Sequence, residues 1–418
     1  MEPMRLRISV FVIAALVVTA ATAQPAIKSG ITLTLGEAVA KGQLQAPALQ
    51  GAHAAMQVAE ANVQLSGMRP IPTLSFEAEN VMGTGRYTGF GGGEKTTSLS
   101  IPLELGGKRQ ARVRVAEAER AVTSLGAQSV LADVTLQLTE AFITLAANER
   151  RLTVDRAGSE LADRAFAAAR ARVHAGKVSP IEEQRADVLR INANVRVGRA
   201  GRAVELARTT LARLTGAPSP VTISANWFDV LDPPEIAGTS ERSLSIATAE
   251  AEVAASSARV DAAQRDRMPD VTVMAGVRRY GESRDKAGTL GLSIPLPLFN
   301  RGTAGIARSL AEVDRAEAAR NAAAQEFEQA FARAQAEVED GLAGAHAATG
   351  PALAAAEEAA RIARIGYDEG KFPQLEMIEA ERSLAETREA AIDALAALHV
   401  ARARLARLRG QNMPIYKD

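Results

Sequence analysis

The sequence predicts a mainly α-helical protein that carries short membrane-type β-strands and is built from two internal repeats. Three observations lead to this fold class. Hydrophobic residues make up 47% of the 418-residue chain but aromatic residues only 4%, so the apolar content is mostly Ala, Val and Leu. Ala favours helix strongly and lets helices pack closely. Long proline-free segments and a recurring order of strand and helix signals are the other two observations.

The charge and cysteine content exclude several classes of protein and site. Lys and Arg together number 49, as do Asp and Glu, so the net charge is zero. A nucleic-acid binder that works by bulk electrostatics needs a basic excess, which this chain lacks. The absence of Cys from the sequence excludes disulfides, thiolate metal sites and cysteine nucleophiles.

The N-terminus has the three-part plan of a secretory signal peptide. Two arginines precede an apolar run from Ile8 to Ala21, and Ala21-Thr22-Ala23 forms a small-x-small cleavage site. We expect residues 1–23 to be removed after export; a transmembrane anchor is the alternative, but the run is short for one. Gln24 follows the cleavage site instead of Cys, so no lipid anchor is expected there. No later stretch reaches about 18 apolar residues, so a membrane-embedded form would have to be a β-barrel.

The mature sequence contains an internal duplication. Leu99-Ser100-Ile101-Pro102-Leu103 recurs as Leu292-Ser293-Ile294-Pro295-Leu296, and Gly176-Lys177 recurs as Gly370-Lys371. The offsets are 193 and 194 residues, and ordered matches at near-constant spacing indicate a duplicated unit. The expected divisions are a first repeat over 24–216, a linker over 217–239, a second repeat over 240–410 and a tail over 411–418.

Each repeat begins with a helix and continues into a β-hairpin. The helices are expected over Leu35–Ser66 and Glu241–Arg265, and a proline follows each of them. The hairpins, over 72–105 and 270–298, alternate apolar residues with small or polar ones. Such strands, about ten residues long, suit a transmembrane barrel, and a half-buried soluble hairpin is the alternative.

Each hairpin is followed by a long helix, a glycine turn and a return helix. No proline and only two glycines lie within 108–174, and its counterpart over 303–367 has one expected irregularity at Gly350-Pro351. Gly176 and Gly370 mark the turns where the chain reverses. The second return helix has a clear heptad pattern. The return helices are expected over 180–214 and 373–409.

Counting strands predicts an oligomer. Each chain offers four strands, whereas the smallest membrane barrels use about eight. Two protomers would supply eight strands and three would supply twelve, and counting alone does not choose between them. In either case the helices must continue the barrel as a tube.

The chain resembles the TolC family of outer-membrane efflux proteins over nearly all of its mature length. The resemblance rests on the doubled plan, on the Ser-Ile-Pro-Leu strand ends at Pro102 and Pro295, and on the turns at Gly176 and Gly370. It implies a homotrimer in which a shared 12-stranded β-barrel, four strands per protomer, is continuous with a periplasmic α-helical barrel of long coiled-coil hairpins. The run from Gly291 to Gly305 looks most like the CzcC-type branch, the outer component of heavy-metal efflux systems.

The resemblance implies an exit duct and not an enzyme. Such a duct lies in the outer membrane of a Gram-negative bacterium, in contact with outer-membrane lipid. It conducts cargo passively to the exterior from a periplasmic adaptor protein and an inner-membrane pump of RND type. Heavy-metal cations are the favoured cargo, and a multidrug or type I secretion duct is the alternative within the class. From another class, a periplasmic coiled-coil scaffold or adaptor would leave the lipid-like strand faces unexplained.

The resemblance places two acidic rings at the start of the second return helix. Counted from Gly370, the family's lumen-facing acids of the periplasmic gate fall on Glu376 and Glu379. A spacing of three residues puts both on one helix face, so a trimer would present two rings of three carboxylates. Such rings attract cations and repel anions. An ordinary solvated helix face is the alternative.

The resemblance also implies a tether that holds the gate shut. The family's gating tyrosine falls on Tyr367 and its acidic partner on Glu182, so a hydrogen bond between neighbouring hairpins is expected. A second family tether uses a basic residue where this chain has Phe372 and a hydroxyl where it has Ile181. Neither side chain can make that polar contact, so the closed state would be held differently or less firmly.

No catalytic or cofactor site emerges from the sequence. Gly106-Gly107-Lys108 lacks the spacing of a phosphate-binding loop and is expected at a strand-to-helix turn. With no Cys and four scattered His, neither a cofactor nor a high-affinity metal site is expected. A conduit needs no such site, because tight binding would slow the exit of the cargo.

Overall fold

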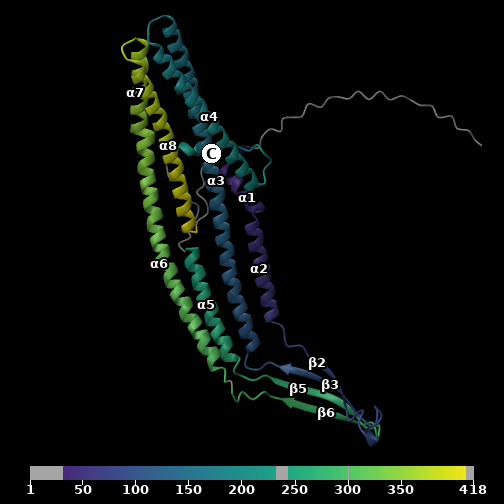
Figure 1. Cartoon of the computed structure of the whole chain (residues 1–418). Coiled ribbons are helices and arrows are strands. Elements are labelled where there is room, and N and C mark those ends of the chain that lie inside the picture. The colour runs from purple at the N-terminus through teal and green to yellow at the C-terminus, as the bar shows by residue number, and fades with distance from the viewer. Residues whose placement is uncertain (1–31, 232–242, 300, 411–418) are drawn as a thin grey trace, which may run out of the picture.

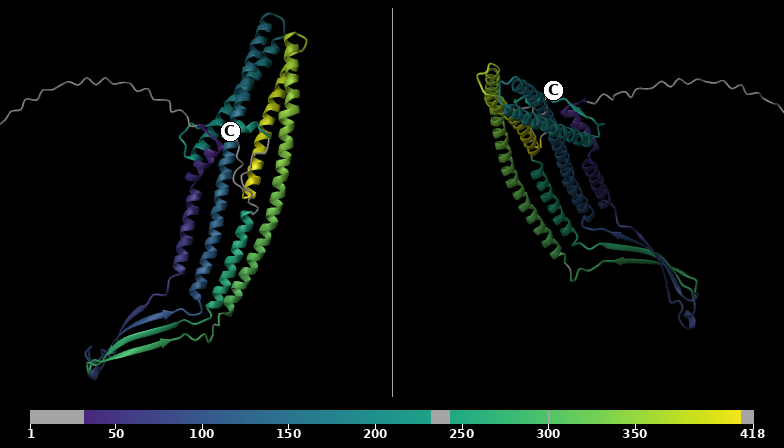
Figure 2. Two further views of the ribbon diagram at one scale, coloured as in Figure 1. Left: turned by 180° about the vertical axis from the view of Figure 1, so that it is seen from behind. Right: turned by 45° about the horizontal axis from the view of Figure 1, so that its top comes forward.

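Long helices form most of the chain, and a small antiparallel sheet projects from one end of them (Figure 1). The computed structural model describes residues 32–231, 243–299 and 301–410. The expected signal peptide, the C-terminal tail and residues 232–239 of the expected linker lie outside the described residues. Two further views place the sheet at the end of the molecule opposite the helical hairpin tips (Figure 2).

The helices run in the order expected for two repeats. Their bounds are α1 (Leu35–Gln45), α2 (Pro47–Ser66), α3 (Lys108–His174), α4 (Pro180–Thr215), α5 (Leu244–Arg265), α6 (Thr303–Ala347), α7 (Leu353–Asp368) and α8 (Gln374–Leu408). Short 3₁₀ turns, η1 (Gly85–Tyr87) and η2 (Asn226–Asp229), lie in the loops.

The single helix expected over Leu35–Ser66 is two helices. Ala46 has an extended ψ of 117° and separates α1 from α2. The cause is Pro47, whose ring disfavours helical backbone at the preceding residue. At the start of α1, Thr34 and Glu37 form a reciprocal capping box, which satisfies two backbone donors.

The long helix of the second repeat is interrupted near Pro351. A π-helical turn, η3 (Ala348–Ala352), joins α6 to α7, and Gly350 within it has a non-helical φ of −99° and ψ of −105°. Pro351 lacks a backbone N–H and its ring crowds the preceding turn, which accounts for the break.

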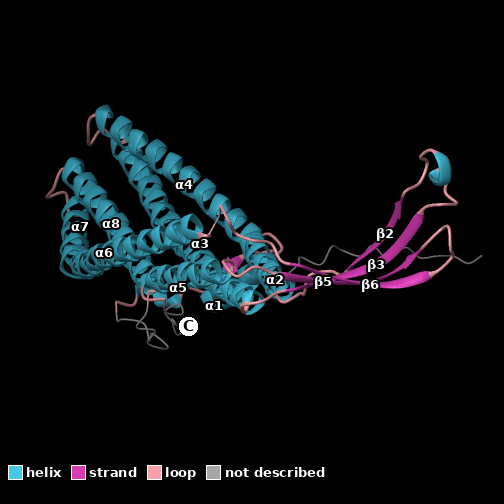
Figure 3. Cartoon of the chain, turned by 90° about the horizontal axis from the view of Figure 1, so that it is seen from below, coloured by secondary structure: helices cyan, strands magenta, loops and turns pink. Residues whose placement is uncertain are grey.

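The sheet has four strands in the order β2-β3-β5-β6, all antiparallel (Figure 3). β6 ends at Ser293, five residues short of the expected end at Leu298, because Pro295 and Pro297 remove backbone donors. Pro102 lies within β3, opposite Thr272 of β5. The strands are β2 (Thr73–Glu79), β3 (Glu94–Leu103), β5 (Val271–Arg279) and β6 (Lys286–Ser293), and β1 (Thr32–Leu33) pairs separately with β4 (Thr222–Ile223).

One face of the four-stranded sheet is apolar and open to the surroundings. Its exposed side chains include Leu290 at 89%, Phe76 at 75% and Leu292 at 65%. The opposite face is polar and more enclosed: Thr96 and Ser98 are buried there. The alternation of faces is the period-two pattern that the sequence indicated.

Two glycines start the long helices where the strands end. Gly107 and Gly302 are the N-cap residues of α3 and α6, and both have a left-handed φ of 74°. Side chains other than glycine rarely adopt this backbone conformation. Beside the first turn, Lys108 Nζ lies 2.8 Å from Asp270 Oδ1, which links the two repeats at the base of the sheet.

α3 also contains an apolar window that is long enough to cross a membrane, with a mean hydropathy of 1.4. The sequence reading anticipated no such stretch. The window is 44% buried, and α3 packs against α2, α4, α5 and α8. Helix packing therefore accounts for its apolar character.

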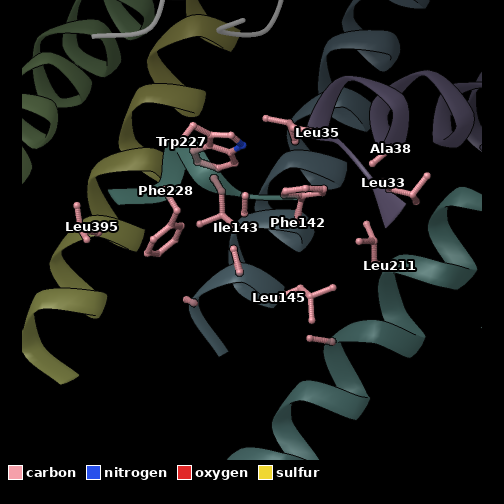
Figure 4. Close-up of a cluster of buried hydrophobic side chains, with 14 of the residues drawn as sticks. Leu33, Leu35, Ala38, Phe142, Ile143, Leu145, Leu211, Trp227, Phe228 and Leu395 are labelled. Atoms are coloured by element: carbon pink, nitrogen blue, oxygen red, sulfur yellow. The ribbon is translucent and has the colours of Figure 1, made fainter. Parts of the chain in front are cut away.

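A hydrophobic core lies where the two repeats meet, around the linker (Figure 4). Trp227 and Phe228 of the linker pack between Phe142 of α3 and Leu395 of α8. The Phe142 and Trp227 rings lie 6.2 Å apart in a stacked arrangement. The linker therefore fastens helices of both repeats together near the middle of the molecule.

Two helices hold the linker by polar contacts as well. Arg150 of α3 donates to the Ala225 carbonyl at 2.9 Å and pairs with Asp229. His399 of α8 is fully buried, and its Nε2–H donates to the Phe228 carbonyl at 2.9 Å. Burial lowers the pKa of His399 to about 4, although the hydrogen bond to Phe228 opposes the shift.

We predict that His399 makes stability depend on pH. The folded protein keeps this imidazole neutral, whereas in the unfolded chain its pKa is near 6.5. Its contribution is complete above about pH 6.5 and is lost as the pH falls toward 4, at a cost of up to about 3 kcal/mol. Thermal midpoints between pH 7.5 and 4.5 should fall less steeply for His399→Gln than for the unchanged protein.

The exposed His346 on α6 provides the matched control for this experiment. His346→Gln removes an imidazole of ordinary solvent access and should leave the pH profile unchanged. Equal slopes for His399→Gln and the unchanged protein would contradict the role assigned to His399.

Candidate functional site at the hairpin tips

The two helical hairpins reverse through equivalent glycine turns at one end of the molecule (Figure 1). Gly176 and Gly370 have left-handed φ values of 65° and 72°. Lys177 N donates to the Arg172 carbonyl at 3.0 Å, and Lys371 N donates to the Gly366 carbonyl at 2.7 Å. These bonds close the helix ends in the manner of a Schellman motif.

Tyr367 joins the two tips within one chain. Its side chain is only 4% exposed at the end of α7. The guanidinium carbon of Arg172, at the end of α3, lies 4.1 Å from the centre of the Tyr367 ring. This is cation–π geometry, and it places the first hairpin tip directly against the second.

The expected hydrogen bond between Tyr367 and Glu182 is not formed within the chain. The Tyr367 hydroxyl is buried and has no hydrogen-bond partner among the described residues. Glu182, in the first turn of α4, acts on it electrostatically. Burial raises the pKa of Tyr367, the charge of Arg172 opposes this, and the charges of Glu182 and Asp368 add to it.

Glu376 and Glu379 are both exposed in the first turns of α8. Between them Met377 is buried, so the two carboxylates share the open side of the helix. Neither carboxylate forms an ion pair or hydrogen bond in the part of the chain that the structure describes. Both carboxylates are therefore available to attract cations.

Phe372 and Ile181, the positions of the family's second polar tether, carry apolar side chains. The Phe372 ring lies so close over Gly366 that a Cβ atom at Gly366 would collide with it. Ile181 is 53% exposed on α4. As the sequence indicated, neither residue makes a polar contact through its side chain.

Sequence reasoning missed two residues of this site, Arg172 and Gln374. Gln374, at the start of α8, is only 4% exposed, and both polar atoms of its amide lack a hydrogen-bond partner among the described residues. Leaving a buried polar group unpaired costs about 1–3 kcal/mol. A basic residue in the last turn of α3 was a visible signal for Arg172, whereas no local pattern marked Gln374.

The described residues contain no cluster of three or more His, Asp or Glu side chains that could hold a metal ion. His399 serves the core, as shown above. The described part of the tips therefore offers exposed carboxylates and a contact between the two hairpins.

Known proteins resemble the chain in sequence. A family model described as "Outer membrane efflux protein" matches residues 40–217 and 238–411. The cobalt-zinc-cadmium resistance protein CzcC of Cupriavidus metallidurans is 30% identical over 298 residues, which cover 70% of this chain and 71% of that protein. The nickel and cobalt resistance protein CnrC of the same organism is 31% identical over 276 residues, covering 65% of this chain and 66% of that protein.

Solved structures share the fold at lower sequence identity. The open state of the MtrE outer membrane channel of Neisseria gonorrhoeae superimposes with a TM-score of 0.76. The two chains are 20% identical, and the match covers 90% of this chain and 88% of that one.

We predict that Arg172 sets the distance between the tips. Arg172→Met keeps most of the side-chain volume but removes the cation, which is worth about 1 kcal/mol in such a contact. Spin labels on cysteines introduced at Lys177 and Lys371 report this distance cleanly, because the sequence contains no other cysteine. The distance distribution should broaden and shift to longer values.

Arg185→Met is the matched control, since Arg185 is an exposed arginine on α4. It should leave the distribution as it is in the unchanged protein. If Arg172→Met behaves like this control, the cation–π contact does not hold the tips together.

Proposed function

The chain belongs to the outer membrane efflux protein family, and on this basis we propose that it is the outer-membrane exit duct of a heavy-metal efflux system. The observation that carries the proposal is the similarity to CzcC over 70% of the chain. Cobalt is named for both CzcC and CnrC, so divalent cobalt is the first cargo to test. The duct is a conduit and not an enzyme.

We propose a homotrimer with a shared 12-stranded barrel. Support comes from the sheet, which has four strands and leaves one edge of β2 and one edge of β6 without a partner strand among the described residues. A spanning sheet must pair every edge, because no water in the hydrocarbon can satisfy backbone groups. The helices would continue the barrel into the periplasm, where an adaptor protein and an inner-membrane pump, of RND type, would deliver the cargo.

The acidic rings fit this conduit. In a trimer, Glu376 and Glu379 would supply two rings of three carboxylates at the periplasmic entrance. Both are exposed and have no side-chain partner among the described residues, so they are available to raise the local concentration of cations. Weak attraction of cations to successive carboxylate rings suits a conduit, because the ion must also be released.

The Tyr367–Glu182 tether belongs to a second arrangement of the tips in this proposal. The Tyr367 hydroxyl is buried and has no hydrogen-bond partner in the described part of the chain, and the charge of Glu182 acts on it. A shift of one tip past the other would let the hydroxyl donate to the carboxylate. A double-mutant cycle of Tyr367→Phe and Glu182→Gln on channel opening tests this bond, and purely additive effects would count against it.

Metal tolerance of the host tests the cargo. Cells that lack this chain should tolerate several-fold less cobalt, zinc or cadmium, while their tolerance of organic drugs stays the same. Restoring the chain should restore metal tolerance. Lost drug tolerance with unchanged metal tolerance would favour a multidrug duct instead.

The same assay tests the acidic rings. Glu376→Gln with Glu379→Gln should restore metal tolerance only in part, because the entrance attracts fewer cations. Glu337→Gln with Asp340→Asn is the matched control: these exposed acids have the same spacing on α6. Full restoration by the Glu376 and Glu379 variant, at equal amounts of protein, would remove the rings from the mechanism.

A further inference from the structure

Three basic side chains form a row across the sheet on its apolar face. Lys95 of β3 lies opposite Arg279 of β5, and Arg279 lies opposite Lys286 of β6. All three are exposed. Adjacent strands are about 4.8 Å apart, so the backbone positions of the three residues lie within about 10 Å of one another. The next position of the row, on β2, is Ala78.

The row caps the apolar band at the end of the strands that bears the hairpin loops. On the same face, Val277 lies two residues from Arg279 in the direction of the helices. Leu99 and Leu290 lie another two residues in that direction, on the neighbouring strands. From Leu103 to Lys95 the strand rises about 27 Å, or roughly 21 Å along the membrane normal at a tilt of about 40°. Apolar bands of outer-membrane barrels are about 25 Å tall, so the row lies at headgroup level.

Among the described residues, no acidic side chain pairs with the row. None of the three side chains forms an ion pair in the part of the chain that the structure describes, although like charges directly opposite one another destabilise a sheet. The acids at this level point to the other face instead. There Arg278 pairs with Glu79 at 2.9 Å and with Glu94 at 3.0 Å.

We propose that Lys95, Arg279 and Lys286 bind the phosphate groups of lipid A, the anionic anchor of lipopolysaccharide in the outer leaflet. This inference rests on the proposed function, which puts the hairpin loops outside the cell and the helices in the periplasm. Phosphate monoesters offer several acceptor oxygens to the ammonium and guanidinium groups, and charge-assisted hydrogen bonds of this kind are strong. The acyl chains would lie against Phe76, Leu99 and Leu290.

A trimer would carry three such sites, one on each protomer. Because Ala78 interrupts the row at β2, the basic patches of neighbouring protomers stay separate. Each protomer would therefore hold its own lipid, independently of the next.

Lipid that accompanies the protein during purification tests the site. The trimer is extracted from outer membranes in mild detergent, and lipid A is measured per protein chain by its hydroxylated fatty acids. The combined variant Lys95→Gln, Arg279→Gln and Lys286→Gln should carry less than half the lipid A of the unchanged protein. Lys95→Arg, Arg279→Lys and Lys286→Arg together keep the charge and should retain the lipid.

Arg315→Gln, Arg320→Gln and Arg333→Gln on α6 form the matched control, since they remove three exposed charges from a helix. This variant should retain its lipid A. Equal lipid A in the Lys95, Arg279 and Lys286 glutamine variant would overturn the inference while leaving the exit duct intact. Failure to recover even the unchanged protein in outer membranes would overturn the duct and the lipid site together.

A second measurement covers a glutamine variant that fails to assemble. The unchanged protein is placed in nanodiscs that contain either diphosphorylated or dephosphorylated lipid A, with inorganic phosphate as a separate addition. Its thermal midpoint should rise with the diphosphorylated lipid alone. A rise with inorganic phosphate as well would identify an anion site without lipid specificity, and equal midpoints in both nanodiscs would exclude phosphate recognition.

Discussion

The unpaired edges of the four-stranded sheet constrain the rest of the molecule. Among the described residues, β2 and β6 each pair on one side only, and one face of the sheet exposes apolar side chains. Unsatisfied backbone groups in hydrocarbon cost several kcal/mol each, and for this reason our proposal has a neighbouring protomer complete the sheet. In our proposal the helices then continue the ring, which explains why a single chain buries so few large side chains along α6.

The core around the linker and the hairpin tips differ in how well their buried groups are packed and paired. Around Trp227 and His399, apolar side chains from both repeats pack against one another, and the buried His399 is hydrogen-bonded to the Phe228 carbonyl, so this region joins the repeats firmly. At the tips the Tyr367 hydroxyl and the Gln374 amide are buried but lack partners among the described residues. Unsatisfied polar groups favour a change of arrangement, and a gate has to be able to change.

Local pattern was enough to predict the helical hairpins, because helix period, proline stops and glycine turns act over a few residues. The same rule applied to Pro47 would have divided the first helix. Local sequence pattern could not predict the contacts between the repeats, because these contacts join residues about two hundred positions apart. Two examples are the contact of Arg172 with the Tyr367 ring and the β3–β5 register that places Lys95 opposite Arg279. Only the three-dimensional pairing of the repeats brings them together.

Cysteine cross-linking between protomers tests the central claim most directly. The sequence has no cysteine of its own, so one is placed on β6 at Thr289 and another is stepped along β2 over Thr73, Ser75 and Glu77. Disulfides form only where Cα atoms lie within about 7 Å, so the product reports strand neighbours. The account predicts covalent dimers and trimers in outer membranes for at least one pair. No product between chains at any position would contradict it.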